Sequence, residues 1–452
     1  MNPLRESVTL LCVLFAGFFG WVLTFARSGP WNVTGMRHWV EAIRNADTEG
    51  GATWALVHSF PWLPTVTLWP FTVFAETRSP LAPAAVSCFF AAAVVASAWF
   101  RLRRSLGAEE TAGVLFLLLV NPLFMDIALT GDFRAPMLLL WYVMCASARG
   151  AQESGDARSF LSIAGLAGMM WFCDPKLMLM MIPFVPLTWL VLPLRVIQAS
   201  PAGGYLVMFF PSLVAFGAVL WVALVMPGRG SAVTDWSVLP VSAGGLLYCL
   251  LACGIVAAPF FHPAKNRLYL TLFALPLAAG CLNLAFSPDP QPLFFAGLLL
   301  SPLLLWAESS SLRRNRLALV ASAFALWMIP VAQNTNRFEV DRELGEWLRA
   351  HGTSSVMADD RTLGAALAFS RSAHNLVLPG TTAYEIQTSL RTPDTDFVVT
   401  PGPAPRDPAD RVLVRYQGAY SRGFPGYRLV FDNGNWRVWG RVKETHQVAA
   451  AY

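Results

Sequence analysis

Charged residues are scarce in this chain of 452 residues, because aspartate, glutamate, lysine and arginine together make up only 13% of it. Lysine is almost absent, so arginine carries nearly all of the positive charge. Hydrophobic residues reach 55%, and many lie in runs of roughly 20, the length at which one helix crosses a bilayer. So little charge excludes an ordinary water-soluble globular protein and predicts a polytopic membrane protein.

The apolar runs contain almost no ionisable residue. Charges within a membrane mark the pathways of ions and protons, so their absence argues against a coupled pump or transporter. The chain also lacks the paired half-chain repeats that many transporters carry. The net charge of +5 reflects how arginines are distributed between inner and outer segments, so it does not call for a nucleic-acid partner.

Cysteine is confined to the predicted membrane spans, where all seven cysteines fall. The predicted exported segments therefore have no disulfide framework. The chain has no CxxC motif and no cysteine–histidine set with zinc-ligand spacing. No metal site is predicted from these residues.

Hydropathy predicts about eleven spans, with the long first loop at residues 27–81. The first run follows Arg5 and lacks a small-residue cleavage site, so it reads as a signal anchor. Basic residues on short segments favour a cytoplasmic N-terminus and an exported tail. The arginine-rich, lysine-poor composition predicts the inner membrane of a bacterium. The predicted spans are residues 7–26, 82–100, 112–129, 135–148, 159–173, 177–193, 205–226, 242–261, 268–286, 292–307 and 317–332.

The tail, residues 333–452, differs sharply in composition and holds 27 of the 61 charged residues. Helices and short strands alternate in it, which predicts a small extracytoplasmic α/β domain following the transmembrane domain of residues 1–332. A closing hairpin is predicted around Asn433-Gly434. No glycine-rich phosphate loop occurs, which favours a lid or docking domain. The predicted helices are 340–350, 362–370 and 383–390, and the predicted strands are 355–358, 375–378, 396–400, 427–431 and 436–441.

The first loop contains two amphipathic segments. In the first, Met36, Trp39, Val40 and Ile43 share one helical face, and Arg37, Glu41 and Arg44 share the other. The second runs from Trp62 to Phe74 and is rich in tryptophan, which is typical of helices that lie along a membrane surface. A loop of this kind commonly forms the roof of a site at the membrane face.

This layout resembles the GT-C superfamily of integral membrane glycosyltransferases. The resemblance rests on WNVTGMRHWVEAIRNADTEGG and HSFPWLPTVTLWPFTVFAE in the first loop, on TGDFRAPMLLLWYVM at the second outer turn, and on DRELGEWLRAHG in the tail. It implies a mainly α, GT-C-like bundle with a lipid-linked, polyprenyl-phosphate sugar as donor. It names no sugar and no acceptor.

The resemblance also implies an acidic residue near the start of the first loop helix, where this chain has Asn32. An amide cannot take a proton at neutral pH, so Asn32 cannot be a general base. The second acidic position falls on Asp132 or, with a shifted alignment, on Arg134. Asp132 is thus the candidate catalytic carboxylate, with an ordinary turn residue as the alternative.

Cations near these positions are candidates for binding the donor phosphate. Arginine presents a planar fork of donors that suits phosphate, although lipid headgroups are an alternative partner for Arg134. For Lys176, a local ion pair with Asp174 is the alternative to binding the donor phosphate. No cofactor is predicted. A divalent metal bound by His38 and His58 is a minor alternative, because a third ligand at fixed spacing is missing. The candidate binding residues are Asn32, Arg37, His58, Arg134 and Lys176.

Two functions from different classes follow. One is a cell-envelope glycosyltransferase that moves a sugar from a polyprenyl-phosphate donor to an exported acceptor. The other is a pseudoenzyme, a GT-C-like membrane subunit that scaffolds a larger complex with a protein partner. The missing acid at Asn32 favours the second, and the loop architecture favours the first.

Overall fold

The computed structural model describes most of the N-terminal half of the chain and most of its tail. The predicted spans at 177–193 and between 242 and 332 lie outside the described residues, as do His58 and Lys176. The described residues are 3–25, 32–47, 62–73, 78–119, 122–154, 157–174, 199–225, 336–370, 375–379, 382–390, 393–402, 410–416 and 423–442.

The chain forms two compact units, and each draws on separate stretches of sequence. The first unit comprises Met1–Ala26, Leu56–Thr67 and Pro83–Gln333. The second comprises Arg27–Ala55, Leu68–Ala82 and Asn334–Tyr452. Most of the first loop, which the sequence alone groups with the transmembrane domain, therefore clusters with the tail.

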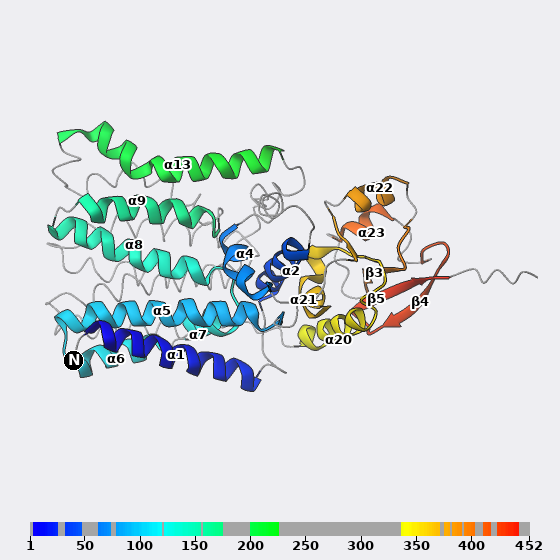
Figure 1. Ribbon diagram of the computed structural model, residues 1–452, viewed down its shortest axis with the longest axis horizontal. Coiled ribbons are helices and arrows are strands. Elements are labelled where there is room, and N and C mark those ends of the chain that lie inside the picture. The colour runs from blue at the N-terminus through cyan, green and yellow to red at the C-terminus, as the bar shows by residue number, and fades with distance from the viewer. Residues whose placement is uncertain are drawn as a thin grey trace, which may run out of the picture. The chain divides into compact units, whose positions relative to one another are not determined.

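The first unit is helical throughout its described residues, and its longer helices run side by side in Figure 1. Helix α9 packs against both α8 and α13. The predicted third span is divided, because α6 ends at Leu119 and α7 begins at Pro122, a residue that suits the first turn of a helix. The helices are α1 (Pro3–Phe25), α4 (Trp62–Leu68), α5 (Ala82–Ser105), α6 (Ala108–Leu119), α7 (Pro122–Leu129), α8 (Ala135–Ser154), α9 (Ala157–Trp171) and α13 (Pro201–Val225).

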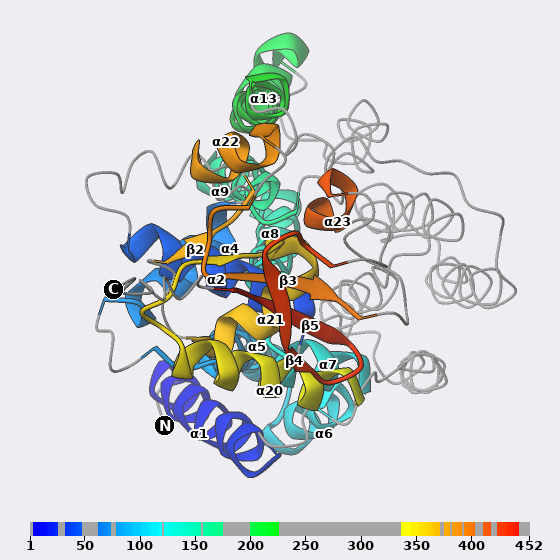
Figure 2. The same cartoon turned by 90° about the vertical axis from the view of Figure 1, so that its right-hand side faces the viewer.

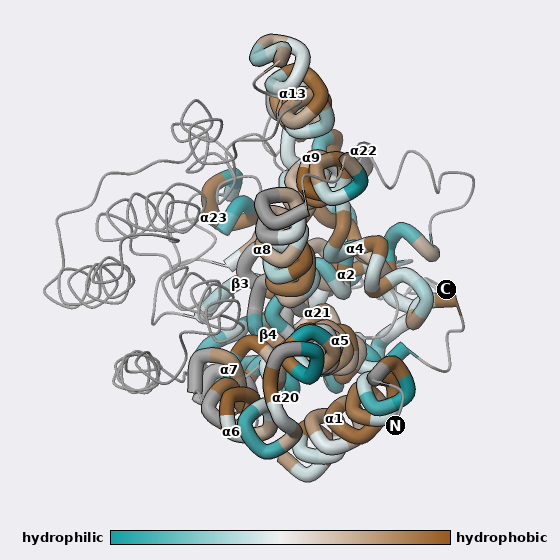
Figure 3. The backbone as a smooth tube through the Cα atoms, turned by 90° about the vertical axis from the view of Figure 1, so that its left-hand side faces the viewer, coloured by the Kyte–Doolittle hydropathy of each residue, from teal (hydrophilic) through white to brown (hydrophobic). Residues whose placement is uncertain are grey.

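Three described helices are long and apolar enough to cross a membrane. They are Leu4–Phe25, Ala82–Arg104 and Pro201–Trp221. Figure 3 shows many apolar residues, in brown, on α1 and α13. A fourth apolar stretch, Ala135–Ala148, is shorter. These helices indicate a membrane protein, and the total of eleven spans stays a prediction.

The tail folds around a five-stranded sheet with strand order β2-β1-β3-β5-β4. The first three strands are parallel, and the last two form an antiparallel hairpin whose β5 pairs with β3. Figures 1 and 2 show α20 and α21 on one face of the sheet and α22 and α23 on the other. The elements are α20 (Asn336–Ala350), β1 (Val356–Met357), α21 (Asp360–Ser370), β2 (Leu376–Val377), α22 (Thr382–Leu390), β3 (Phe397–Pro401), α23 (Arg411–Arg415), β4 (Tyr427–Asp432) and β5 (Trp436–Arg441).

Every helix and strand predicted for the tail is present within a few residues of its predicted bounds. Helix α23 is the element that the sequence did not predict, because it has five residues and follows a proline-rich stretch. It begins after Asp410, whose carboxylate caps it by accepting from the backbone N–H of Leu413 at 2.9 Å.

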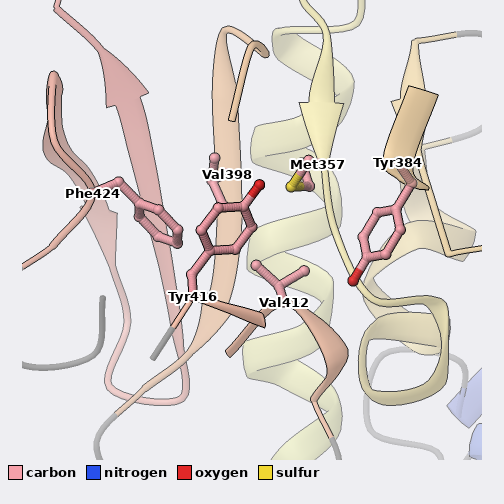
Figure 4. Packing of buried hydrophobic residues seen from close by; sticks show 6 residues of the cluster. All are labelled: Met357, Tyr384, Val398, Val412, Tyr416 and Phe424. Carbon is pink, nitrogen blue, oxygen red and sulfur yellow. The ribbon is translucent and has the colours of Figure 1, made fainter. Parts of the chain in front are cut away.

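An apolar cluster on the α22 and α23 side holds the second unit together. It brings side chains from β1, β3, α22 and α23 into contact, as Figure 4 shows. Because contacts from four elements converge there, the strands and helices of the tail stabilise one another. The cluster consists of Met357, Tyr384, Val398, Val412, Tyr416 and Phe424.

Two pieces of the first loop complete the second unit. Helix α2 (Val33–Asp47) packs against α21, and the short 3-10 helix η1 (Trp69–Phe71) touches α2. The predicted helix at Met36–Ile43 is thus confirmed, and so is helical structure at Trp62–Phe71.

Candidate functional site

The turn between α7 and α8 is shaped by Gly131. Its φ of +77° lies in the left-handed region, which a side chain disfavours. A Cβ at this position would also lie 3.0 Å from the backbone nitrogen of Ala84 and from the Cβ of Pro83, at the start of α5. Glycine is therefore needed for both the conformation and the close packing, and it directs the chain into Asp132.

Asp132 and Arg134 form a buried ion pair directly after this glycine. The guanidinium donates from Nε to Oδ1 of Asp132 at 3.1 Å and from Nη2 to Oδ2 at 3.0 Å. The backbone N–H of Arg134 also donates to Oδ1 at 2.8 Å. The side chains are only 5% and 7% exposed, so the pair is shielded from water.

Neighbouring residues add a ring and a second carboxylate to this turn. The guanidinium carbon of Arg134 lies 5.2 Å from the ring centroid of Phe133, within the range of a cation–π contact. Asp126, on α7, interacts electrostatically with both Asp132 and Arg134. The turn therefore gathers two carboxylates and one guanidinium.

Asn32 serves as the N-terminal cap of α2. Its side-chain oxygen accepts a hydrogen bond from the backbone N–H of Gly35 at 2.9 Å, and its carbonyl accepts from Met36 at 3.0 Å. Asparagine is among the preferred residues at this position. The amide therefore has a structural role, which neither requires nor excludes contact with a substrate.

Arg37, His38 and Glu41 form a polar group one turn further along α2. His38 Nδ1 lies 3.3 Å from one oxygen of Glu41, and Arg37 Nε lies 3.9 Å from the other. Both His38 and Glu41 are buried, so the polar side of α2 is covered at these residues. The pattern on one helix identified the apolar face, but it could not reveal that the opposite face is covered as well.

Asp47 and Arg78 form a second buried ion pair that the sequence analysis missed. Nη2 of Arg78 lies 2.6 Å from Oδ1 of Asp47, and the side chains are 8% and 6% exposed respectively. Arg78 also donates from Nε to the carbonyl of Thr72 at 3.2 Å. No local pattern marks the pair, because 31 residues separate its members; only the opposite charges within one loop could have hinted at it.

The predicted site residues thus occur in two groups. Asp132 and Arg134 lie together in the first unit, and Asn32 and Arg37 lie near the start of α2 in the second. The sequence predicts that Asn32, His58, Asp132 and Arg134 converge in one pocket, and this stays a prediction. Among the residues that the structure describes, no three histidine, cysteine or acidic side chains are grouped as metal ligands.

Comparison with protein-family models, with curated proteins and with solved structures found no match to this chain. The case for function therefore rests on the two groups of residues and on the layout of the loop.

Proposed function

We propose that this protein is a membrane glycosyltransferase of the GT-C type. It resides in the inner membrane of a bacterium, with an extracytoplasmic tail, and transfers a sugar from a polyprenyl-phosphate donor to an exported acceptor. The proposal is supported by the resemblance of the first loop and second outer turn to that superfamily, and by the apolar helices.

The buried Asp132–Arg134 pair is the observation that carries the proposal. A buried ion pair adds little net stability, because the loss of hydration opposes the attraction, and apolar residues of similar size often stabilise a fold better. A turn that retains such a pair is therefore a candidate for chemistry. The pair offers the two groups that transfer from a phosphate-linked sugar needs, a carboxylate and a cation.

In the proposed reaction, an acceptor hydroxyl oxygen bonds to the anomeric carbon of the donor sugar. The bond from that carbon to the phosphate oxygen breaks, and its electron pair leaves with the polyprenyl phosphate. Asp132 takes the hydroxyl proton, for which its hydrogen bonds with Arg134 must loosen. Arg134 then stabilises the charge that develops on the phosphate, with Arg37 and Lys176 as further cations.

A second candidate function is a catalytically inactive GT-C-like subunit of a larger membrane complex. Asn32 favours it, because the position of the expected acid is occupied by an amide that caps α2. The hydrogen bonds that Arg134 makes to both oxygens of Asp132 also fit a carboxylate with a purely structural role.

Replacement of Asp132 distinguishes the two functions. The exported glycan and the lipid-linked sugars are compared between the wild type, a strain lacking the gene, and a strain carrying Asp132→Asn. Loss of a positioned general base commonly slows a reaction about 10²–10⁴-fold, so we expect the variant to match the deletion strain. Arg134→Ala should weaken donor binding.

Controls separate lost chemistry from lost folding. The double variant Asp132→Asn/Arg134→Gln removes both charges of the pair, so it should insert at the wild-type level, measured by immunoblot of membranes, and still be inactive. Glu109→Gln, an exposed carboxylate on α6, should retain full activity. Wild-type glycan in the Asp132→Asn strain, or unchanged glycan and lipid-linked sugar after deletion of the gene, would contradict the enzymatic function.

A further inference from the structure

Helix α2 belongs to the first loop in sequence but to the second unit in space, beside α21. We propose that the first-loop helix and the C-terminal domain form one folded module on one face of the membrane, in which α21 holds α2 in position. The packing of α2 against α21 in one module does not depend on the proposed function. Its consequence for donor binding rests on the proposed function.

Helices α21 and α2 approach each other closely at Gly364 and Arg37. A Cβ at Gly364 would lie 3.0 Å from the Cβ of Arg37, 3.1 Å from its Cα and 3.2 Å from its backbone nitrogen. These distances are near or below the limit of ordinary carbon contacts. The two helix backbones therefore approach closely because residue 364 has no side chain.

The burial of α2 shows that the helix depends on tertiary contacts. Met36, Trp39, Val40 and Ile43 are at most 2% exposed, and the polar residues His38 and Glu41 are buried as well. An isolated helix of 15 residues is marginal in water. Figures 1 and 2 both place α2 beside α21, the helix that it contacts most extensively among the described elements.

The other end of α2 is fixed within the same module. Asp47, the last residue of the helix, makes its buried ion pair with Arg78, which lies in the part of the loop that clusters with the tail. The ion pair thus joins two segments of the first loop within the second unit, and helix packing joins α2 to α21. Two segments that pack this closely cannot have a bilayer between them.

Under the proposed function, this arrangement makes the C-terminal domain a positioning element for catalysis. Arg37, a candidate donor-binding residue, lies at the point where α2 meets α21. A displacement of α2 would move this cation relative to the donor phosphate. We therefore expect damage to α21 to weaken donor binding, although α21 carries no proposed catalytic residue.

A disulfide tests the packing in native membranes. The full chain carries Arg37→Cys and Gly364→Cys, together with a protease recognition sequence inserted after the exposed Ser200. The two Cβ atoms need to separate by only a few tenths of an ångström to reach the roughly 3.5–4.5 Å of a disulfide. After oxidation and cleavage, we expect the two fragments to remain joined on a denaturing gel until reductant is added. Each single-cysteine variant is the matched control and should release its fragments.

Gly364→Val tests the positioning role. Its side chain would force α2 away from α21, so the first loop should become more sensitive to added protease. In membranes, the KM for the polyprenyl-phosphate sugar should rise about tenfold with a smaller change in kcat, the pattern expected when a ground-state contact is lost. Gly113→Val, on α6, is the matched control, because a Cβ there has no atom within 4 Å.

The outcomes separate the inference from the proposed function. Fragments of the oxidised double-cysteine variant that separate like those of the controls would overturn the module, whatever the activity. If the oxidised fragments stay joined but Gly364→Val changes neither the proteolysis of the first loop nor the KM, the positioning role would be overturned. Full activity in Asp132→Asn would remove the proposed function, while the disulfide would still decide whether the module exists.

Discussion

The hydrogen bond from the backbone N–H of Gly35 to the side chain of Asn32 makes the start of α2 sensitive to one residue. Asn32→Ala removes the cap and should destabilise the helix by about 1 kcal/mol, whereas Asn32→Asp keeps the acceptor and adds a charge that favours a helix N-terminus. We expect amide hydrogen exchange in α2 to quicken in the alanine variant and to stay at or below the wild-type rate in the aspartate variant.

The aspartate variant also bears on function. Asn32→Asp restores the acidic residue that the GT-C resemblance implies, so activity should be unchanged or higher. Equal hydrogen exchange in the alanine variant and the wild type would show that the cap does not stabilise α2.

Tyr416 links the stability of the tail to alkaline pH. Burial, followed by the nearby Tyr427, raises the pKa of Tyr416 from 10.0 to about 12. The folded tail therefore holds the phenolic proton more tightly than the unfolded chain does. The stability that depends on this proton is complete below pH 10 and is lost as the pH rises through about 12.

Tyr416→Phe tests this dependence. The hydroxyl donates to the carbonyl of Gln387 at 3.0 Å, so the variant should lose about 1 kcal/mol at neutral pH. Between pH 10 and 12 its stability should fall less steeply than that of the wild type, because one raised group no longer titrates. Urea unfolding of the detergent-solubilised protein across this range measures both effects. Parallel pH profiles for the two proteins would contradict the assignment.

The structure around a single residue was predictable where its immediate neighbours determine the backbone conformation. Gly131 and Asp132 form a polar turn between apolar runs, so the turn was recognisable from the sequence, whereas the ion pair between Asp132 and Arg134 was not predicted. The burial of Glu41 was not, because it depends on an element distant in the chain. The same limit hid the pairing of Asp47 with Arg78.

At the scale of elements, the loop should be sensitive to the loss of either single member of this Asp47–Arg78 pair. Removing one member of a buried pair leaves an uncompensated charge, at a typical cost of about 3–5 kcal/mol. Arg78→Met should therefore lower the urea midpoint of unfolding strongly, whereas Asp47→Asn/Arg78→Met should recover much of the loss.

The exposed pair Arg342–Glu346 on α20 provides the matched control. Its atoms lie 3.1 Å apart, but the side chains are 38% and 51% exposed. Removing Glu346 should change stability by less than about 0.5 kcal/mol. Similar losses from the two pairs would show that burial does not set the contribution of Asp47 and Arg78.

Elements of the tail were predictable because strand and helix patterns alternate there with clear turns. Their association with α2 was not, because no pattern within either stretch indicates a partner about 320 residues away in the sequence. Within the third predicted span, α7 begins at Pro122. Proline removes a helix hydrogen bond, and here it opens the second helix.

At the scale of the whole molecule, packing and topology constrain each other. If α2 and α21 lie on one face of the membrane, the chain must cross the bilayer an even number of times from α5 to α20, with α5 itself counted as the first crossing. The ten spans predicted from residue 82 to residue 332 satisfy this condition. An odd number would place the tail opposite the first loop, where α2 could not reach α21.

Reporter fusions test this arrangement in full. Alkaline phosphatase, which is active only after export, and a cytoplasmic reporter with the reverse requirement are each fused after Asp47, Leu106 and Gly352. We expect the export reporter to be active at Asp47 and Gly352 and the cytoplasmic reporter at Leu106, because the arginines at 101–104 favour the cytoplasmic side. Opposite results at Asp47 and Gly352 would exclude a common module. Activity of the same reporter at Leu106 and Gly352 would instead show that the number of spans after α5 is wrong.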